Sequence, residues 1–434
     1  MLTKPYYSVK AMQNQRKSPE KLRNLQLKKL REIIRYAHEH VPYYRNSWKK
    51  MRINSNSIQK FEDVKRFPII NRKILGRNHS DFISDEYVKY LNLLPKMTSF
   101  LFVRSTSGTT GEPMRLYFNP DAKDFLDAVY ARALINVGYN PLKPLLYFWW
   151  QQTPQKELYH IFRLFKKIYV PSEWTEEEQL AFMQKIRPEY IYYFPSALYF
   201  ISRLIMSENI EIDFQPKLII SHAEILTERM RKIIEDAFDT KVYDQYGANE
   251  FNRIAWECKE RNGYHIDADS VFIEIVDENY EEVAEGEVGK VLITGLVNKV
   301  IPLIRYELGD FLMKAESEQL NHKCGINLPV GIKSVEGRKE HSNIQGKNII
   351  TQKKFLEQVL MFLDKQHNLR KFQSLVDYKN KKLLIKYTAS GDGPLQDLEN
   401  KIRINNYKIF CKKVRTINKN KITGKILLLE KIKD

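Results

Sequence analysis

The residues best suited to binding an anion lie in one loop, Arg104–Pro113, which reads RSTSGTTGEP. Its glycines let backbone amides approach an anion closely, and its hydroxyl groups can donate hydrogen bonds to phosphate oxygens. It is not a Walker loop, because the G-x-x-x-x-G-K-[ST] spacing is absent. Apolar runs on both sides predict a strand, a loop and a strand. Since many surface turns share this composition, the loop alone leaves phosphate binding and an ordinary turn open.

Five further polar motifs follow the loop along the chain. They are SHAE at 221–224, DQYGANE at 244–250, PLIRYELGD at 302–310, EGRKEH at 336–341 and ITGK at 422–425. Taken singly, Asp310 could cap a turn, Glu250 could form a surface ion pair, and Lys425 could be one surface lysine among many. Their order along the chain is what makes a shared function the better interpretation.

In that order the motifs resemble those of the acyl-adenylate-forming superfamily. They are most similar to those of the phenylacetate–coenzyme A ligase family and its CapK-like relatives from capsule biosynthesis. The resemblance runs nearly end to end and includes the phrase VPYYR at 41–45. It implies an α/β fold with a large N-terminal adenylation domain at 1–336 and a small, mobile α+β lid at 337–434. It also implies an enzyme that uses ATP and Mg²⁺ to convert a carboxylic acid into an acyl-adenylate, releasing pyrophosphate.

The resemblance assigns nucleotide-binding roles to the matching residues. The ATP phosphates would be held by Ser107, Gly108, Thr109, Thr110 and Gly111. The residues against the base would be Ala223, Glu224, Tyr246 and Gly247. The ribose hydroxyls would bind Asp310, and phosphate or ribose would also contact Arg305 and Arg338. The Mg²⁺ ligand would be Glu250.

The catalytic residues that the resemblance implies are Thr109, Glu250 and Lys425. Lys425 would approach the substrate carboxylate and the α-phosphate, where a positive charge offsets the repulsion between two anions. The family usually has two aspartates at the hinge between its domains, whereas this chain has Glu340 and His341. That departure leaves the details of domain rotation open.

Four residues have the types and grouping of a metal site. Cys258 and His265 lie seven residues apart, and His322 and Cys324 lie two apart. Some members of the resembled family bind structural zinc with a Cys and a His in the first segment and C-x-C-G in the second. Here the second segment reads H-x-C-G, and a Cys₂His₂ set is an acceptable zinc shell. The alternative is a merely buried Cys258 and an unrelated Cys324; Cys411 is expected in the core.

Aromatic residues at the ends of two predicted strands could form the pocket for the acid. Trp149 and Trp150 end one strand, and Tyr193 and Phe194 end the next, so they could offer a wall to an aryl or apolar acid. The same side chains could instead fill the core. The resemblance implies coenzyme A as the acceptor. It leaves open a carrier protein, an amino sugar, or a noncatalytic scaffold that only binds the nucleotide.

The elements that must position these residues alternate between about 120 and 250. Helical and strand-like stretches there indicate α/β layers with much parallel pairing, whereas the β-rich residues 264–312 predict an antiparallel subdomain. A helix is expected within 20–50, ending at a proline, because apolar residues recur every three or four positions. Further helices are expected at 352–363 and 394–405, between strands.

The net charge of +18 reflects 71 basic and 53 acidic residues, and it is unevenly distributed. Residues 1–60 carry 15 basic against 3 acidic residues, and residues 337–434 carry 23 against 9, so the middle is acidic. The basic ends lack an RNP-like strand, a zinc-finger spacing and a heptad zipper, which argues against specific nucleic-acid binding. A basic small domain would suit a phosphorylated cofactor or an acidic carrier protein.

Three cysteines are too few for a disulfide scaffold, and the first residues lack the apolar core of a secretory signal. No uncharged apolar run reaches the roughly 18 residues of a membrane span. We therefore expect a cytoplasmic protein without a transmembrane segment, either a monomer or a homodimer.

Overall fold

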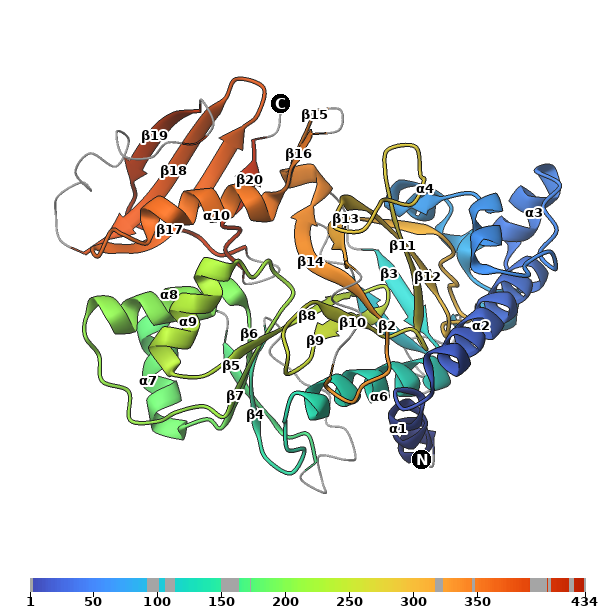
Figure 1. Ribbon diagram of the computed structural model, residues 1–434, viewed down its shortest axis with the longest axis horizontal. Helices are drawn as coiled ribbons and strands as arrows, with labels where there is room; N and C mark the ends of the chain where they lie inside the picture. Colours follow the sequence, from blue (N-terminus) through green and yellow to red (C-terminus); the bar gives the residue numbers. More distant parts are fainter. Residues whose placement is uncertain are drawn as a thin grey trace. The chain divides into compact units, whose positions relative to one another are not determined.

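The computed structural model describes residues 3–91, 101–105, 114–149, 164–171, 173–316, 323–345, 348–390, 404, 407–420 and 425–432. The chain forms two compact units, each made of two separate stretches of sequence. Unit 1 comprises 1–136 with 246–334, and unit 2 comprises 137–245 with 335–434. Figure 1 shows the helices and strands of both units.

The N-terminal part of unit 1 is helical. Its elements are α1 (Thr3–Asn14), α2 (Pro19–His40), α3 (Pro42–Lys50), α4 (Arg72–Arg77), α5 (Asp85–Leu91) and α6 (Pro120–Asn136), with 3₁₀ helices at Phe61–Arg66 and His79–Phe82. The Ser18 hydroxyl caps α2 by accepting a hydrogen bond from the Lys21 amide, and Pro19 occupies the first turn, where no helical hydrogen bond is lost. The helix ends at His40, before Val41 and Pro42, as predicted, because the residue before a proline disfavours helical backbone.

Unit 1 also contains a largely antiparallel sheet. Its strands lie in the order β11 (Val271–Val276), β12 (Val288–Gly295), β13 (Tyr306–Lys314), β14 (Val330–Arg338), β10 (Tyr264–Ile266) and β9 (Asn252–Glu257). The last four residues of β14 belong to unit 2. The short β1 (Ile70–Asn71) pairs with β13 in parallel, and β2 (Phe102–Ser105) pairs with β3 (Arg115–Phe118) in antiparallel register. The β-rich region therefore has the antiparallel character that its sequence predicts.

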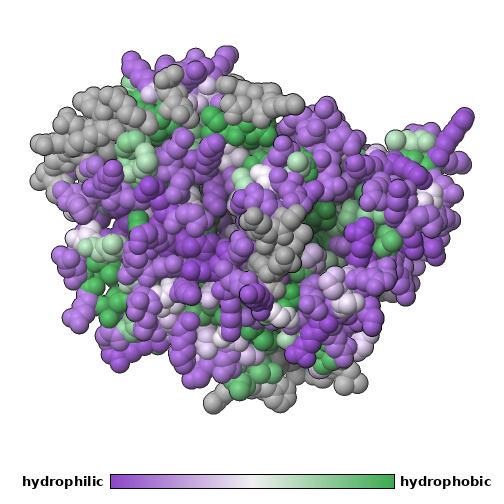
Figure 2. All heavy atoms as spheres, viewed as in Figure 1, coloured by the Kyte–Doolittle hydropathy of each residue, from purple (hydrophilic) through white to green (hydrophobic). Residues whose placement is uncertain are grey.

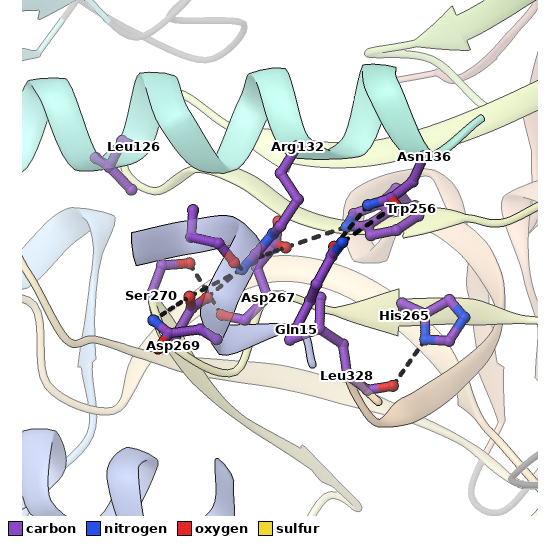
Figure 3. A network of polar contacts seen from close by, with 12 residues as sticks. Gln15, Leu126, Arg132, Asn136, Trp256, His265, Asp267, Asp269, Ser270 and Leu328 are labelled. Carbon is purple, nitrogen blue, oxygen red and sulfur yellow. Dashed lines mark hydrogen bonds and ion pairs between the residues drawn. The ribbon is translucent and has the colours of Figure 1, made fainter. Parts of the chain in front are cut away.

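A buried charged network joins α1 and α6 to the segment that follows β10 (Figure 3). The Arg132 guanidinium of α6 donates to both carboxylate oxygens of Asp269 at 2.8 and 2.9 Å and to Asp267 at 2.5 Å. It also donates to the Ala11 carbonyl of α1, and the Asn14 amide of α1 donates to Asp269. All three ionic side chains are fully buried, so their charges must be balanced inside the protein.

The first part of unit 2 is a parallel α/β layer. Its strands lie in the order β8 (Val242–Ala248), β7 (Leu218–His222), β6 (Tyr190–Tyr193), β4 (Leu145–Trp149) and β5 (Lys167–Pro171), and neighbouring strands are parallel. Helices α7 (Glu176–Ile186), α8 (Pro195–Ser207) and α9 (Glu228–Phe238) alternate with these strands along the chain. The last three residues of β8 belong to unit 1. Parallel strands need such crossover helices, so the predicted α/β alternation is confirmed.

The second part of unit 2 is a four-stranded sheet with a helix on one face. The strands lie in the order β19 (Lys408–Lys413), β18 (Lys382–Ala389), β17 (Leu369–Asp377) and β20 (Leu429–Lys431). The helix is α10 (Gln352–Leu363), preceded by a 3₁₀ turn at Lys339–His341 and the hairpin of β15 (Asn343–Gln345) and β16 (Asn348–Ile350). Phe355 and Val359 of α10 pack against Phe372 and Ile385 of the sheet. The helix expected at 394–405 lies almost wholly outside the described residues.

One hydrophobic core joins the two parts of unit 2. It contains Leu198 of α8 and Ile234 of α9 together with Phe355 and Phe372. The contact-based units and the predicted domains 1–336 and 337–434 divide the chain by different criteria. The mobile lid therefore stays a prediction.

The surface agrees with the charged composition. Figure 2 shows hydrophilic residues over most of one face. Among the described residues, no helix combines the length and the apolar character that crossing a membrane requires.

We expect Arg132→Met to lower the free energy of unfolding by about 3–5 kcal/mol, because it leaves two buried carboxylates without their cation. Urea unfolding followed by circular dichroism measures this change. Arg35→Met is the matched control, since Arg35 is exposed on α2, and its effect should stay within about 0.5 kcal/mol. Equal losses in the two variants would contradict a stabilising role for the network.

Candidate functional site

The structure describes only the first two residues of the predicted phosphate loop, Arg104 and Ser105, and resumes at Met114, just after the loop. Ser107, Gly108, Thr109, Thr110 and Gly111 lie outside the described residues. Ser105 ends β2 and pairs with Arg115 of β3, so two paired strands close the base of the loop. The predicted strand on each side is therefore present, and the phosphate-binding role of the loop stays a prediction.

The YGANE motif lies where β8 turns back into β9. A Cβ atom on Gly247 would lie 2.3 Å from the carbonyl oxygen of Asn252, so this close approach of two backbones requires glycine. Within the turn, the side-chain amide of Asn249 donates to the carbonyl oxygen of Ser105 at 2.9 Å. Glu250, the predicted Mg²⁺ ligand, is half-buried in the same turn. The turn that carries Glu250 is thus tied to the start of the predicted phosphate loop.

Tyr246 and Asp310 contact each other directly. The Tyr246 hydroxyl donates to Asp310 Oδ2 at 2.7 Å, and both side chains are almost fully buried. Tyr246 lies on β8 and Asp310 on β13, so the contact joins two motifs that are 64 residues apart. A carboxylate can accept several hydrogen bonds, and one from Tyr246 fixes its orientation while leaving capacity for others.

The side chain of Arg305 is held by hydrogen bonds inside unit 1. Its guanidinium donates to both carboxylate oxygens of Glu274 at 3.0 and 3.1 Å and to the carbonyl oxygens of Lys65 and Phe67. These contacts use four of the five N–H donors that a guanidinium offers. The residue is almost fully buried and has a left-handed backbone, with φ +48°. Its surroundings therefore indicate a bracing role, and the nucleotide contact that the resemblance implies stays a prediction.

Lys425 lies against the SHAE motif within unit 2. Its Nζ donates to the Ala223 carbonyl oxygen at 2.6 Å, joining residues 202 positions apart, and lies 4.8 Å from the centre of the Phe194 ring. Ala223 has φ +63°, an uncommon backbone conformation for a residue other than glycine. Unusual backbone of this kind persists where the surrounding structure holds it, and it is enriched at functional sites.

Glu224 supplies negative charge beside this lysine. Its Oε2 accepts a hydrogen bond from the Ser196 amide at 3.1 Å, in the first turn of α8, where the helix dipole favours an anion. Its Oε1 is buried and has no hydrogen-bond partner among the described residues. Burial raises the pKa of Glu224, while the Lys425 charge and the Ser196 hydrogen bond lower it. Burial lowers the pKa of Lys425, with Glu224 opposing this shift and Arg338 adding to it.

The predicted site residues thus form two groups, which lie in different units. In unit 2, Lys425 is brought to Ala223 and Glu224, and exposed Arg338 is close enough for its charge to act on the lysine. In unit 1, the residues brought together are Tyr246, Gly247, Glu250 and Asp310.

The proposed aromatic wall is only partly as predicted. Tyr193 is fully buried and donates to Gln179 Oε1 at 3.2 Å, so it belongs to the core. Phe194 lies beside Lys425, the side chain of Trp149 is not described, and Trp150 lies outside the described residues.

The stack that sequence reasoning missed is made of Tyr147, Tyr192 and His222. The rings of Tyr192 and His222 are 4.0 Å apart, and those of Tyr147 and Tyr192 are 4.9 Å apart and nearly parallel. Tyr147 lies in the middle of β4, Tyr192 is the penultimate residue of β6, and His222 is the last residue of β7. Strand alternation was the available signal, because it puts Tyr192 and Tyr193 on opposite faces of the sheet.

Three of the four predicted zinc ligands meet in unit 1. The ligand atoms of Cys258, His265 and Cys324 all lie within 4.8 Å of one another, and Cys324 Sγ is 3.4 Å from His265 Nε2. His265 Nδ1 is 2.7 Å from the Leu328 carbonyl oxygen (Figure 3). When Nδ1–H donates to that carbonyl, Nε2 faces the two sulfur atoms with its lone pair, as a metal ligand does. The fourth predicted ligand, His322, lies outside the described residues.

Comparison with known proteins yields relatives by sequence and by structure. None of the protein-family models matches the chain. A phenylacetate-coenzyme A ligase of Thermus thermophilus is 31% identical over 304 residues, which cover 67% of this chain and 65% of that protein. Protein CapK of Staphylococcus aureus is 25% identical over 359 residues, covering 77% and 73%. The chain therefore spans slightly less than two thirds of the length of the Thermus ligase.

Two solved structures have similar folds. A 2-hydroxyisobutyryl-CoA ligase, crystallised in the postadenylation state with R3-HIB-AMP, superposes with a TM-score of 0.74 at 16% identity, covering 97% of this chain and 91% of that one. The anthranilate CoA ligase AuaEII, in complex with anthranoyl-AMP, has a TM-score of 0.53 at 15% identity, covering 75% and 64%. The predicted α/β fold class is thereby confirmed.

We expect Gly247→Ala to destabilise the turn between β8 and β9, because the added methyl group would overlap the Asn252 carbonyl. The expected loss is about 1–3 kcal/mol of unfolding free energy, measured by urea unfolding. Gly76→Ala is the control: no atom lies within 4 Å of a Cβ at Gly76, in α4, and alanine should be neutral or stabilise by up to about 1 kcal/mol. A neutral Gly247→Ala would show that the turn can relax.

Proposed function

We propose that this chain is an AMP-forming acid–thiol ligase of the acyl-adenylate-forming superfamily. Its similarity in sequence to phenylacetate-coenzyme A ligases and to CapK, and in fold to a 2-hydroxyisobutyryl-CoA ligase, supports this proposal. It joins a carboxylic acid to the α-phosphate of ATP, releases pyrophosphate, and then passes the acyl group to coenzyme A. The observation that carries this proposal is the contact of Lys425 with Ala223, since it gathers two of the motifs around one cation.

The proposed nucleotide roles are those that the resemblance implies, and the contact between Tyr246 and Asp310 in unit 1 supports one of them. Asp310, oriented by Tyr246, accepts hydrogen bonds from the two ribose hydroxyls, a task that suits a carboxylate. The hydroxyl and amide groups of the loop 107–111 bind the phosphates, with Thr109 as the catalytic member. Arg338 remains a proposed contact to phosphate or ribose, whereas Arg305 has only one N–H donor left for such a contact.

Mg²⁺ is a proposed cofactor, and Glu250 fits it. The carboxylate is half-buried on a turn that is anchored to Ser105, at the start of the phosphate loop. Mg²⁺ is usually bound through one or two carboxylates together with substrate phosphates. When bound, the ion would neutralise part of the negative charge of the triphosphate.

Lys425 acts in the first half-reaction. A carboxylate oxygen of the acid attacks the α-phosphorus, and the bond from that phosphorus to pyrophosphate breaks. Because two anions approach each other, a cation placed at the reacting atoms lowers the barrier. Glu224 helps to keep the lysine protonated, since its negative charge opposes the effect of burial on the lysine pKa. In the second half-reaction the thiol sulfur of coenzyme A attacks the acyl carbon, AMP leaves, and the thiol proton passes to solvent.

The acid is proposed to be aryl or apolar. Support comes from the stacked Tyr147, Tyr192 and His222 and from Phe194 beside the catalytic lysine. Aromatic walls bind flat apolar groups well. The relationship to CapK supports a place in surface-polysaccharide synthesis, and use of ATP and coenzyme A supports a cytoplasmic location.

Two other functions are compatible with the same site. The acyl group could pass to a carrier protein or an amino sugar, and the basic residues at 337–434 favour acidic acceptors among these. The chain could also be a scaffold that binds the nucleotide without catalysis. Replacing Lys425 distinguishes these functions: either enzyme should lose adenylation activity, whereas a scaffold has no such activity to lose.

We expect wild-type protein to exchange pyrophosphate into ATP with at least one acid from a panel of aryl and short acids. Lys425→Ala should slow this exchange by about 100-fold or more, the usual effect of removing a donor at developing charge. Lys431→Ala, at an exposed lysine of β20, is the control and should keep full activity. ATP binding without exchange by any acid would refute the ligase and favour the scaffold.

We also propose a structural zinc ion held by Cys258, His265 and Cys324, with His322 as the fourth ligand. The distances fit: two sulfur atoms and one nitrogen within 4.8 Å suit a tetrahedral ion with bonds of about 2.0–2.3 Å. Zinc requires thiolates, and burial raises the pKa of Cys258 to about 12, so the ion itself must stabilise the deprotonated form. Such an ion would crosslink β10 to the loop before β14.

Metal analysis of purified protein should give about one zinc per chain. Cys258→Ser should release most of it and lower the melting temperature by several degrees, because structural zinc contributes directly to folding. Cys411→Ser, on β19 in unit 2, should change neither value. A zinc-free wild-type protein with an unchanged melting temperature would refute the site.

A further inference from the structure

The C-terminal sheet of unit 2 has a face that points away from helix α10. Phe372 and Ile385 point inward and are fully buried in the core with that helix. Side chains alternate along a strand, so the residues that follow them, Gln373 and Lys386, point to the other face. Gln373 pairs with Lys386, and Lys386 pairs with Lys412, so these three residues form one row across β17, β18 and β19.

This row borders a hollow of about 420 Å³. The remaining lining residues come from the segment after β19: Val414, Thr416, Ile417 and Asn418. A volume of this size lies within the range of small-molecule sites.

The lining of the hollow favours a phosphorylated ligand. Lys386 and Lys412 supply two ammonium groups, and neither forms an ion pair with any residue in the described part of the chain. Among the described residues that line the hollow there is no carboxylate, so none of them neutralises its positive charge. Thr416 and Asn418 add neutral hydrogen-bonding groups, and Val414 offers apolar surface for a base. Ammonium groups form strong, charge-assisted hydrogen bonds with phosphate oxygens.

We propose that this hollow binds the phosphate groups of coenzyme A, holding the acceptor by the end remote from its thiol. The inference rests on the proposed function, in which coenzyme A receives the acyl group. Anchoring the charged nucleotide end leaves the long thiol-bearing arm free to reach the acyl-adenylate. The excess of basic residues at 337–434, 23 against 9 acidic, then serves to attract an acceptor that carries several negative charges.

The test is charge reversal of the row. Lys386→Glu combined with Lys412→Glu should raise the KM for coenzyme A about 10-fold or more, because two attractive contacts become repulsive. The rate of pyrophosphate exchange and the KM for ATP should stay unchanged. Lys386→Gln with Lys412→Gln is a milder pair that removes both charges without reversing them, and it should give a smaller rise in the same direction.

The matched control lies on the same strands. Lys382 and Lys408 are also paired across β18 and β19 and are exposed, but they do not line the hollow. Reversing both with Lys382→Glu and Lys408→Glu changes the net charge equally. It should alter the KM for coenzyme A by no more than about twofold, an effect of long-range charge alone.

Each remaining outcome decides the matter. An unchanged KM for coenzyme A, or an equal rise in the control, would overturn the proposal. So would a rise in the KM for ATP alone, because ATP carries the same phosphate chemistry. Wild-type protein that exchanges pyrophosphate but forms no thioester with coenzyme A would overturn the proposal and leave adenylation intact.

If no acid supports exchange, the proposed function fails, but the hollow can still be tested by calorimetric titration of coenzyme A into the full chain. Equal affinity of the wild type and the charge-reversal variant would then refute binding at the hollow.

Discussion

An ammonium group that loses part of its contact with water needs oxygen atoms in exchange, and this constraint shapes the contact between the two parts of unit 2 at Lys425. Lys425 meets it with the Ala223 carbonyl, which a left-handed backbone presents, and with the charge of Glu224. Glu224 is in turn held by the first turn of α8 through Ser196. The lysine is therefore positioned by backbone geometry and a helix terminus, both of which are more rigid than a partner on a flexible side chain.

Unit 1 organises its motifs by a different means. The Tyr246 hydroxyl donates a hydrogen bond that orients the Asp310 carboxylate. The side-chain amide of Asn249 donates to the Ser105 carbonyl oxygen, which anchors the turn that carries Glu250. The absence of a side chain at Gly247 lets the two backbones of this turn come close. The two hydrogen bonds join motifs that are far apart in sequence, so the geometry depends on the fold of unit 1 and not on one loop.

Much of this organisation could be predicted from local patterns. Helix α2 followed from its three- and four-residue repeat, and the α/β layer followed from alternating elements, because both patterns report local backbone preference. The grouping of Cys258 and His265 with Cys324 followed from the resemblance of their two segments to a family with zinc-binding members, and the structure places their ligand atoms together. In each case the signal lay within one segment or in the spacing between a few segments.

What could not be predicted depends on partners distant in sequence. No sequence pattern around Arg305 predicts that its guanidinium will donate to Glu274 and to two backbone carbonyl oxygens. The buried contact of Arg132 with Asp267 and Asp269 has no local signature either, because it exists only once α6 has docked. The shared core of 137–245 with 335–434 is likewise a tertiary property.

The interleaving of the two units sets an order for folding on the ribosome. Unit 1 has all of its chain once residue 334 has emerged, whereas the α/β layer at 137–245 must wait for 335–434. Until then its share of the common core, including Leu198 and Ile234, stays without Phe355 and Phe372. An incomplete core exposes apolar surface that is prone to aggregation. We therefore expect chaperones to bind nascent chains mainly at the α/β layer 137–245.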